Sequence, residues 1–314
     1  MPAALLVAVT ALAQSAVLLL AAPLLRTLIK KIKARLQQRQ GPPLLQGYYD
    51  LVKLLRKETV RADTSSWVYV AAPRVYFAAV LAATTLVPVF VSAAPLEIAG
   101  GVLLLVGCLA LGRFALALGA LDTGSPFGGM GASRDMTIAA LAEPALMLGL
   151  FAVALAGGSL NLGTLVRLEL ASGVSFRPAD LLAFAGLFVI VIAETGRIPV
   201  DNPATHLELT MIHEAMVLEY SGPDLALVEW AGALKEMLYL TLLANLFLPV
   251  GLAHEADALP LVVSFAAWGG KLLLLAVAVA VIESTNAKLR LFRVPELMSL
   301  SLGLAFLALA VRFL

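Results

Sequence analysis

Long apolar runs alternate with short charged segments along the whole chain. A helix needs roughly 20 apolar residues to cross a hydrocarbon core of about 30 Å. The runs here are continuous rather than alternating, which favours helices over a closed barrel. The pattern predicts an all-α integral membrane protein, a single polytopic domain over residues 1–314 with about eight transmembrane helices. These helices are expected at about 3–25, 68–91, 98–121, 136–156, 179–193, 227–250, 259–282 and 295–314.

The segments between the apolar runs are expected to form cytoplasmic loops at about 26–67, 122–135, 194–226 and 284–294. The first is strongly basic, with ten Lys and Arg residues against three carboxylates. By the positive-inside rule it is cytoplasmic, which places both termini outside. Within it, the amphipathic stretch Gly47 to Glu58 is expected to lie along the membrane interface. The second loop is predicted from its Gly, Ser and Pro content.

An acidic stretch from residue 194 to residue 220 separates two apolar runs. The chain is 61% hydrophobic and 14% charged, yet this stretch holds one arginine, two histidines and five carboxylates: Glu194, Asp201, Glu208, Glu214 and Glu219. Pro199 and Pro203 end the preceding helix. Thr205 with Glu208 forms a capping box for a helix to about Tyr220. That helix is otherwise nearly apolar, so we expect it to be buried, where carboxylates crowd. A solvated, capped hairpin is the alternative.

Cofactor and metal motifs are weak or missing in the sequence. His206 and His213 are seven residues apart without a third close ligand, so core or capping histidines are the better interpretation. Cys108 is the one cysteine, which leaves no iron–sulfur ligand set. There is also no Rossmann glycine motif and no P-loop. We therefore expect the chain itself to bind neither a metal nor a cofactor.

Ionisable residues inside the apolar runs are the other candidates for function. They are Arg113, Glu143, Glu229, Lys235, Glu236 and Lys271. Pro144 follows Glu143 and removes a backbone donor, which favours a polar partner there. A lone carboxylate at that depth is expected to be protonated much of the time. With Arg113, Lys235 or Lys271 as a nearby cation, Glu143 would suit a proton relay. Structural ion pairing is the alternative for each residue.

Three stretches carry a family resemblance: the R-x-Q-x-R-x-G-P pattern of Arg35 to Pro42, the segment Asp50 to Glu58, and Glu194-x-x-Arg197-x-Pro199-x-Asp201. They resemble the complex I subunit 1 family, which in bacteria is a membrane component of NADH-quinone oxidoreductase. The continuation from Asn202 to Glu214 is more similar to the hydrogenase branch of that family. That branch includes formate hydrogenlyase subunit 4, hydrogenase-4 component C and the membrane subunit of CO-linked, energy-converting hydrogenases.

The resemblance implies a non-catalytic membrane subunit that anchors a peripheral redox arm and links it to ion translocation. It implies that the chain lies in the cytoplasmic membrane. The implied partners are the large and small NiFe-hydrogenase subunits and iron–sulfur subunits of the arm, and antiporter-like membrane subunits. The NiFe centre and the clusters would lie in those partners; nucleic acid is not expected. The implied arm-docking residues are Arg35, Arg39, Lys57 and Arg197. The candidate coupling residues are Glu143, Glu194, Asp201, Glu208, Glu214, Glu219, Glu229, Glu236, Lys235 and Lys271.

Three alternatives remain open from the sequence. The first is a quinone-binding subunit of a complex I-type enzyme, although the sequence after Asp201 departs from the quinone-type pattern. The second is a stand-alone secondary transporter, which usually shows internal repeats and helices broken at the midplane. The third is a passive anchor whose buried charges are all structural. The electron donor and the choice between H⁺ and Na⁺ stay open.

Overall fold

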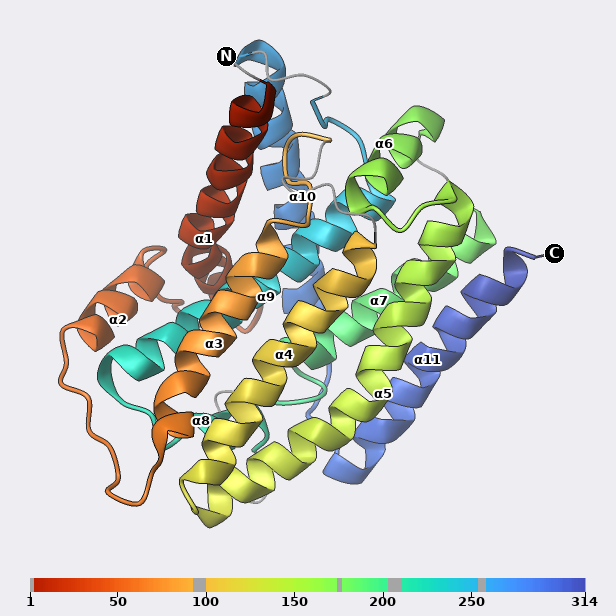
Figure 1. Ribbon diagram of the computed structural model, residues 1–314. Helices are drawn as coiled ribbons and strands as arrows, with labels where there is room; N and C mark the ends of the chain where they lie inside the picture. The colour runs from red at the N-terminus through yellow and green to blue at the C-terminus, as the bar shows by residue number, and fades with distance from the viewer. Residues whose placement is uncertain (1–2, 93–99, 174–176, 203–210, 254–257, 314) are drawn as a thin grey trace.

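The computed structural model describes residues 3–92, 100–173, 177–202, 211–253 and 258–313, and these residues are mostly helical (Figure 1). No strand occurs among them, only one isolated bridge between Val91 and Ala253. The predicted all-α class is therefore confirmed. The helices are α1 Ala3–Leu36, α2 Gln46–Leu55, α3 Trp67–Thr84, α4 Gly101–Asp122, α5 Pro126–Gly157, α6 Leu162–Ser172, α7 Pro178–Glu194, α8 His213–Val217, α9 Gly222–Phe247, α10 Ala258–Thr285, the 3-10 turn η1 Leu291–Arg293, and α11 Val294–Val311.

Six of the described helices are long and apolar enough to cross a membrane: α1, α3, α4, α5, α10 and α11. The chain is thus a multi-pass membrane protein. Two further long helices, α7 and α9, complete the bundle; α7 has 17 residues, and α9 carries charged residues along its length. The count of eight spans remains a prediction.

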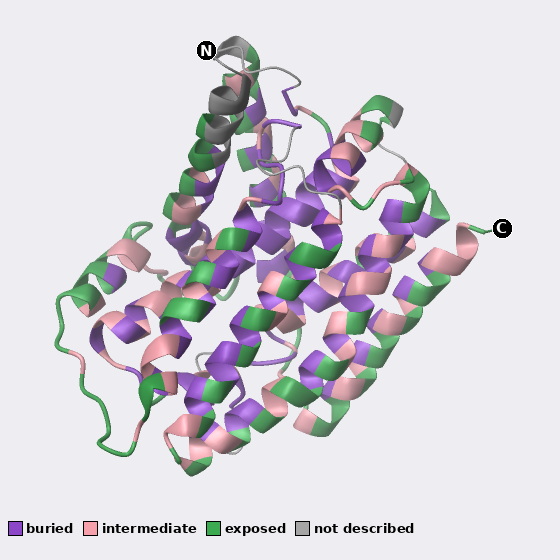
Figure 2. Cartoon of the chain, in the orientation of Figure 1, coloured by how far each residue is buried: buried purple, intermediate pink, exposed green. Residues whose placement is uncertain are grey.

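Helix α9 is the centre of the bundle and packs against α1, α2, α3, α6, α7 and α10. Every residue from Ala233 to Leu246 is buried. Figure 2 shows buried residues, in purple, concentrated in the interior of the bundle. A helix that is buried all round belongs in a core. Lys235 and Glu236 lie within this run, so their charges need partners inside the protein.

Helices α3, α4, α5, α11 and α7 pack successively against one another beside α9 (Figure 1). The short helix α2 confirms the predicted amphipathic segment, because Leu51 is buried against the bundle while the charged residues Asp50 and Lys53 are exposed. It contacts α1 and α9. The arrangement leaves the buried charges of α9 facing α1 on one side and α4, α5 and α7 on the other.

The predicted loop at 122–135 is wrong, because residues 126–135 form the first turns of α5. Ser125 caps the helix, its hydroxyl accepting from the backbone N–H of Gly128, and Pro126 is at its first position. The glycines allow close packing rather than a loop. A Cβ on Gly131 would lie 2.9 Å from that of Ala215 and 3.0 Å from the Ile212 carbonyl oxygen.

The predicted continuous helix from Thr205 to Tyr220 is also wrong. Residues 211 and 212 are not helical, and α8 covers only His213–Val217. Asp201 explains where α8 begins, since its carboxylate accepts from the backbone N–H groups of Ile212 and His213 at 3.3 and 3.2 Å. Thr205, His206 and Glu208, including the proposed capping box, lie outside the described residues.

Candidate functional site

The first group of charged side chains surrounds Arg113 of α4, whose side chain is 9% exposed. Its guanidinium contacts Asp135 at 3.5 Å, Glu143 at 3.2 Å, and Glu194 at the end of α7. Lys235 of α9 also pairs with Glu194, at 2.8 Å, and the Tyr239 hydroxyl lies 3.3 Å from the same carboxylate oxygen. This Arg113 cluster brings together α4, α5, α7 and α9. It has three carboxylates against two cations among the described residues.

Glu143 is not the lone carboxylate that the sequence suggested, because Arg113 donates a hydrogen bond to it. Its side chain is 35% exposed, so it lies at the edge of the cluster and faces out of this chain. Glu194, by contrast, is 3% exposed and is contacted by two cations. Glu194 is therefore the inner carboxylate of the cluster and Glu143 the outer one.

The second group alternates carboxylates and cations along α1, α9 and α10. Arg26 pairs with Glu229 at 2.7 Å and lies 3.8 Å from Glu236. Arg197 then bonds Glu236 at 2.5 Å and lies 3.4 Å from Glu283, which Lys33 also contacts at 3.4 Å. We call these six residues the Arg197 cluster. It has three carboxylates and three cations, so its formal charge is zero.

The acidic loop after α7 is bonded to Lys288 and Leu289, which lie just before η1. Lys288 lies 2.7 Å from Asp201, and the backbone N–H of Leu289 donates to the carbonyl of Pro199 at 2.8 Å. Because Asp201 also holds the start of α8, one buried carboxylate connects three segments. This Asp201 contact fixes the loop that closes the site.

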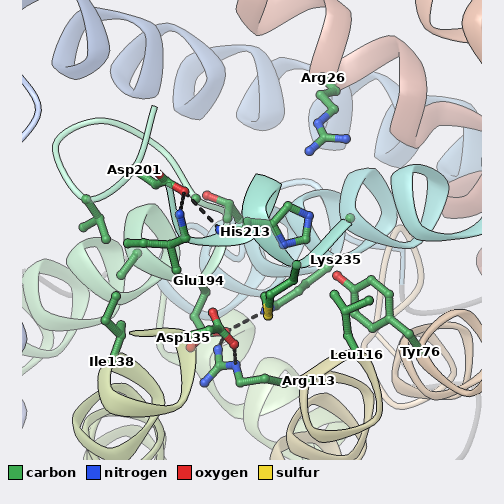
Figure 3. A pocket seen from close by; sticks show the side chains of 17 residues that line it. Arg26, Tyr76, Arg113, Leu116, Asp135, Ile138, Glu194, Asp201, His213 and Lys235 are labelled. Atoms are coloured by element: carbon green, nitrogen blue, oxygen red, sulfur yellow. Dashed lines mark hydrogen bonds and ion pairs between the residues drawn. The ribbon is translucent and has the colours of Figure 1, made fainter. Parts of the chain in front are cut away.

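A cavity of about 50 Å³ lies between these groups (Figure 3). Its wall includes Arg113, Asp135, Glu194 and Lys235 from the Arg113 cluster, Arg26 from the Arg197 cluster, and Asp201. The ring of Tyr76 and the side chain of His213 complete much of the polar lining. A cavity this size and this polar holds a few waters, each of which needs about 10–15 Å³. Water in the cavity would join charged groups that make no direct contact with each other.

Three other predicted site residues lie apart from the cavity. Lys271 donates to the Asn245 side chain at 2.7 Å and to the carbonyl of Leu248 at 3.0 Å. It therefore stabilises the C-terminal end of α9 and is not a cation for Glu143. Glu219 is exposed, and Glu214 is half-buried. Burial raises the pKa of the Glu214 carboxyl above its usual value, while the charge of His213 opposes that rise.

The predicted docking residues divide in two. Arg35, Arg39 and Lys57 are exposed, as a docking surface requires. Arg197 is buried and bonds Glu236 and Glu283, so its expected place on that surface is wrong. The physical reason is that α9 and α10 bring Glu236 and Glu283 to the loop that carries Arg197, which a linear sequence does not reveal.

Sequence reasoning missed Arg26, Asp135, Glu283 and Tyr239 as members of the site. The hydrophobic pattern places Arg26 and Asp135 in loops and Glu283 at a helix boundary. One feature of the sequence did indicate part of the site. Glu229 and Glu236 are two helical turns apart and share a face of α9, which indicates that a neighbouring segment places a cation against that face. No pattern in the sequence would have identified Arg26 as that cation.

Comparisons with known proteins give consistent results. A family model described as NADH dehydrogenase matches residues 8–313. Hydrogenase-4 component C of Escherichia coli (strain K12) is 35% identical over 298 residues, covering 95% of this chain and 93% of that protein. Formate hydrogenlyase subunit 4 of the same strain is 33% identical over 297 residues, covering 95% and 96%. The H subunit of NADH-quinone oxidoreductase from Burkholderia vietnamiensis (strain G4 / LMG 22486) is 31% identical over 235 residues, covering 71% and 65%.

The fold also occurs in a solved structure of the membrane-bound sulfane sulfur reductase, an archaeal respiratory membrane complex. The TM-score is 0.85, covering 97% of this chain and 99% of the other, at 19% sequence identity. This likeness concerns the arrangement of the helices, which almost the whole chain shares.

Proposed function

The chain belongs to the NADH dehydrogenase family, and we propose that it is the membrane-anchor and coupling subunit of a multisubunit, energy-converting hydrogenase of the formate hydrogenlyase type. The two relatives with the highest identity reported above are hydrogenase and formate hydrogenlyase subunits, and they align over nearly their full length. In this role the chain holds a soluble redox arm against the cytoplasmic membrane. It also transmits the arm's redox state to ion movement, of H⁺ or Na⁺, in neighbouring membrane subunits.

Anchoring rests on the basic surface at the end of α1. A hollow of about 620 Å³ is lined by Lys31, Arg35, Arg39 and neutral residues, with no carboxylate in its wall. The guanidinium group of an arginine can donate two parallel hydrogen bonds to one carboxylate. An acidic segment of the soluble arm fits this surface, and exposed Lys57 extends it. Arg197 belongs to the interior and takes no part.

Coupling rests on the cavity, which is the observation that carries the proposal. Asp201 fixes the loop that closes it, and Glu194 lies in its wall between Arg113 and Lys235. A shift of that loop on a redox event in the arm changes which cation Glu194 faces. In the part of the chain that the structure describes, the Arg113 cluster has three carboxylates but only two cations. Such a shift therefore changes how many protons the cluster binds.

The outward exposure of Glu143 supports a membrane partner beside α5. A carboxylate at membrane depth that faced lipid would be costly, so a polar group of another subunit is expected there. Antiporter-like subunits are the proposed neighbours. Soluble NiFe-hydrogenase large and small subunits and iron–sulfur subunits are the proposed arm. In the described part of this chain no group of three or more metal-ligating side chains is present.

The test is purification of the tagged chain from its native host in mild detergent, with identification of the co-purifying subunits. A NiFe large subunit supports the proposal. Subunits of an NADH- and quinone-linked enzyme in its place would overturn it.

A second candidate function, quinone binding, is favoured by one observation. A cavity of about 320 Å³ lies under α2, lined by polar Arg26, Lys30 and Glu229 and by apolar Leu51 and Leu54. That volume lies within the range of small-molecule sites. Sensitivity of the native activity to quinone-site inhibitors distinguishes this candidate from the first.

A further inference from the structure

The short segment Leu289 to Arg293, between α10 and α11, displays an aromatic side chain. Phe292 in this segment is 89% exposed, more than any other large apolar side chain among the described residues. Single exposed apolar residues are common and by themselves indicate nothing. What distinguishes this one is how firmly the backbone on both sides of it is held.

Both flanks of Phe292 are anchored. Leu289 and Leu291 pack against a small apolar core that is separate from the main one. The core residues are Ile138, Ala142, Val200, Ile212, Val294 and Met298. The Leu289 N–H donates to the Pro199 carbonyl, and the Arg293 N–H donates to the Arg290 carbonyl, each at 2.8 Å. Phe292 is thus presented outward by a backbone that is fixed before any partner binds, which lowers the entropic cost of association.

The side chains beside Phe292 are cationic. Arg290 and Arg293 are both exposed, and both lie within two residues of the aromatic ring. An aromatic side chain between arginines is the composition of the few residues that dominate binding energy in protein interfaces. A complementary surface would offer an apolar pocket with carboxylates on its rim.

A bilayer is the other surface that a protruding aromatic could meet. Aromatic belts at membrane interfaces use Trp and Tyr, whose polar atoms stay in contact with water. Phe292 has no such polar atom. The segment is moreover hydrogen-bonded to the polar acidic loop at Pro199, and Lys288, the residue just before the segment, pairs with Asp201 of that loop. These features favour a protein partner.

We propose that Leu289 to Arg293 is a docking contact for a soluble subunit of the complex. Phe292 enters an apolar pocket of that subunit, and Arg290 and Arg293 pair with carboxylates around it. The inference rests on the proposed function, which supplies the soluble arm. It adds a consequence: the bound segment also holds the Pro199 carbonyl, and Lys288, the residue just before the segment, holds Asp201, so docking stabilises the loop that lines the cavity.

The test compares Phe292→Ala with Phe306→Ala in the tagged, complete complex. Phe306 is 60% exposed on α11 and serves as a matched control of the same chemistry. The measurement is the amount of soluble subunits retained per membrane chain during purification in mild detergent. Truncation of a central interface residue weakens binding by about tenfold or more. Phe292→Ala is therefore expected to lose the soluble subunits, as is the double variant Arg290→Glu, Arg293→Glu, while Phe306→Ala retains them.

Equal retention by Phe292→Ala and Phe306→Ala would overturn the inference. Normal retention together with a lower yield of the Phe292→Ala chain in membranes would also overturn it, by assigning the segment to the bilayer. Arg39→Glu separates this inference from the proposed function. Release by Arg39→Glu but not by Phe292→Ala rejects only the new contact, whereas retention in both variants rejects the proposed docking surface as well.

Discussion

Replacing Glu143 by glutamine tests the coupling proposal most directly. The substitution keeps the shape of the side chain and removes its titration. Its structural cost is small, because the Glu143 side chain is 35% exposed and its 3.2 Å contact with Arg113 is one of three carboxylate contacts of that arginine. Glutamine also keeps an oxygen that can accept the hydrogen bond from Arg113. The complex is therefore expected to assemble normally.

Arg113→Met supplies the contrast. It leaves Glu194 buried with Lys235 as its remaining cation and removes the partner of Asp135 and Glu143. Loss of one member of a buried ion pair costs about 3–5 kcal/mol, a large part of the typical stability of a domain. This variant is expected to assemble poorly. Comparing the two variants separates loss of titration from loss of structure.

The assay is ion uptake or membrane potential per turnover in vesicles that contain the complex. In Glu143→Gln the Arg113 cluster has two carboxylates and two cations, so the carboxylate in excess is gone. We expect the ratio of ions to turnover to fall, while redox activity with artificial carriers persists. A ratio equal to that of wild type, with normal assembly, would make Glu143 structural and leave the Asp201 loop as the coupling element.

Topology, the Arg197 cluster and Glu214 can each be tested as well. A tag at residue 1 or 314 is expected to be accessible from outside and one near Lys30 only from the cytoplasm; a cytoplasmic C-terminus would contradict the eight-helix arrangement. Arg197→Met removes a cation that Glu236 and Glu283 share, so it should lower the free energy of unfolding by about 3–5 kcal/mol. The measurement is a lower melting temperature, while the soluble arm is not lost selectively. Glu214→Gln tests the raised pKa of that carboxyl: folding favours its neutral form, so its stabilising effect is complete below the unfolded value of about 4.3 and is lost as pH rises through the raised pKa. Melting at several pH values should show the variant gaining stability over wild type as pH rises in that window; a constant difference would refute the burial argument.

The hydrophobic pattern predicted the fold class and most helices because a membrane helix is a run of consecutive apolar residues. The amphipathic helix α2 appears where the sequence suggested it. The family resemblance, read from the segments around Arg39 and Arg197, is confirmed by the family match. Composition failed at residues 126–135, where glycines permit α5 to pack against α4 and α8 instead of forming a loop.

The site could be predicted only as a set of residue types. Arg113 was correctly considered a partner of Glu143, yet Lys271 was an equal candidate and lies elsewhere. Which cation faces which carboxylate depends on the rotation of each helix about its axis, and a helix that is buried on all sides, as α9 is from Ala233 to Leu246, carries no amphipathic signal for that rotation. Arg26 shows the same limit, because a cation at the end of an apolar run equally suits a loop and a buried pair.

The charge counts of the two clusters suggest a division of labour within one cavity wall. In the Arg197 cluster every carboxylate is matched by a cation, so its formal charge is zero and it is suited to hold α1, α9 and α10 together. The Arg113 cluster has one carboxylate more than its cations, and its outermost member, Glu143, faces out of the chain. In the coupling role proposed above, a proton that enters from the cavity would stop at the Arg113 cluster, where the carboxylates outnumber the cations, and would leave past Glu143. A movement of the Asp201 loop that changed the cations around Glu194 would drive that transfer.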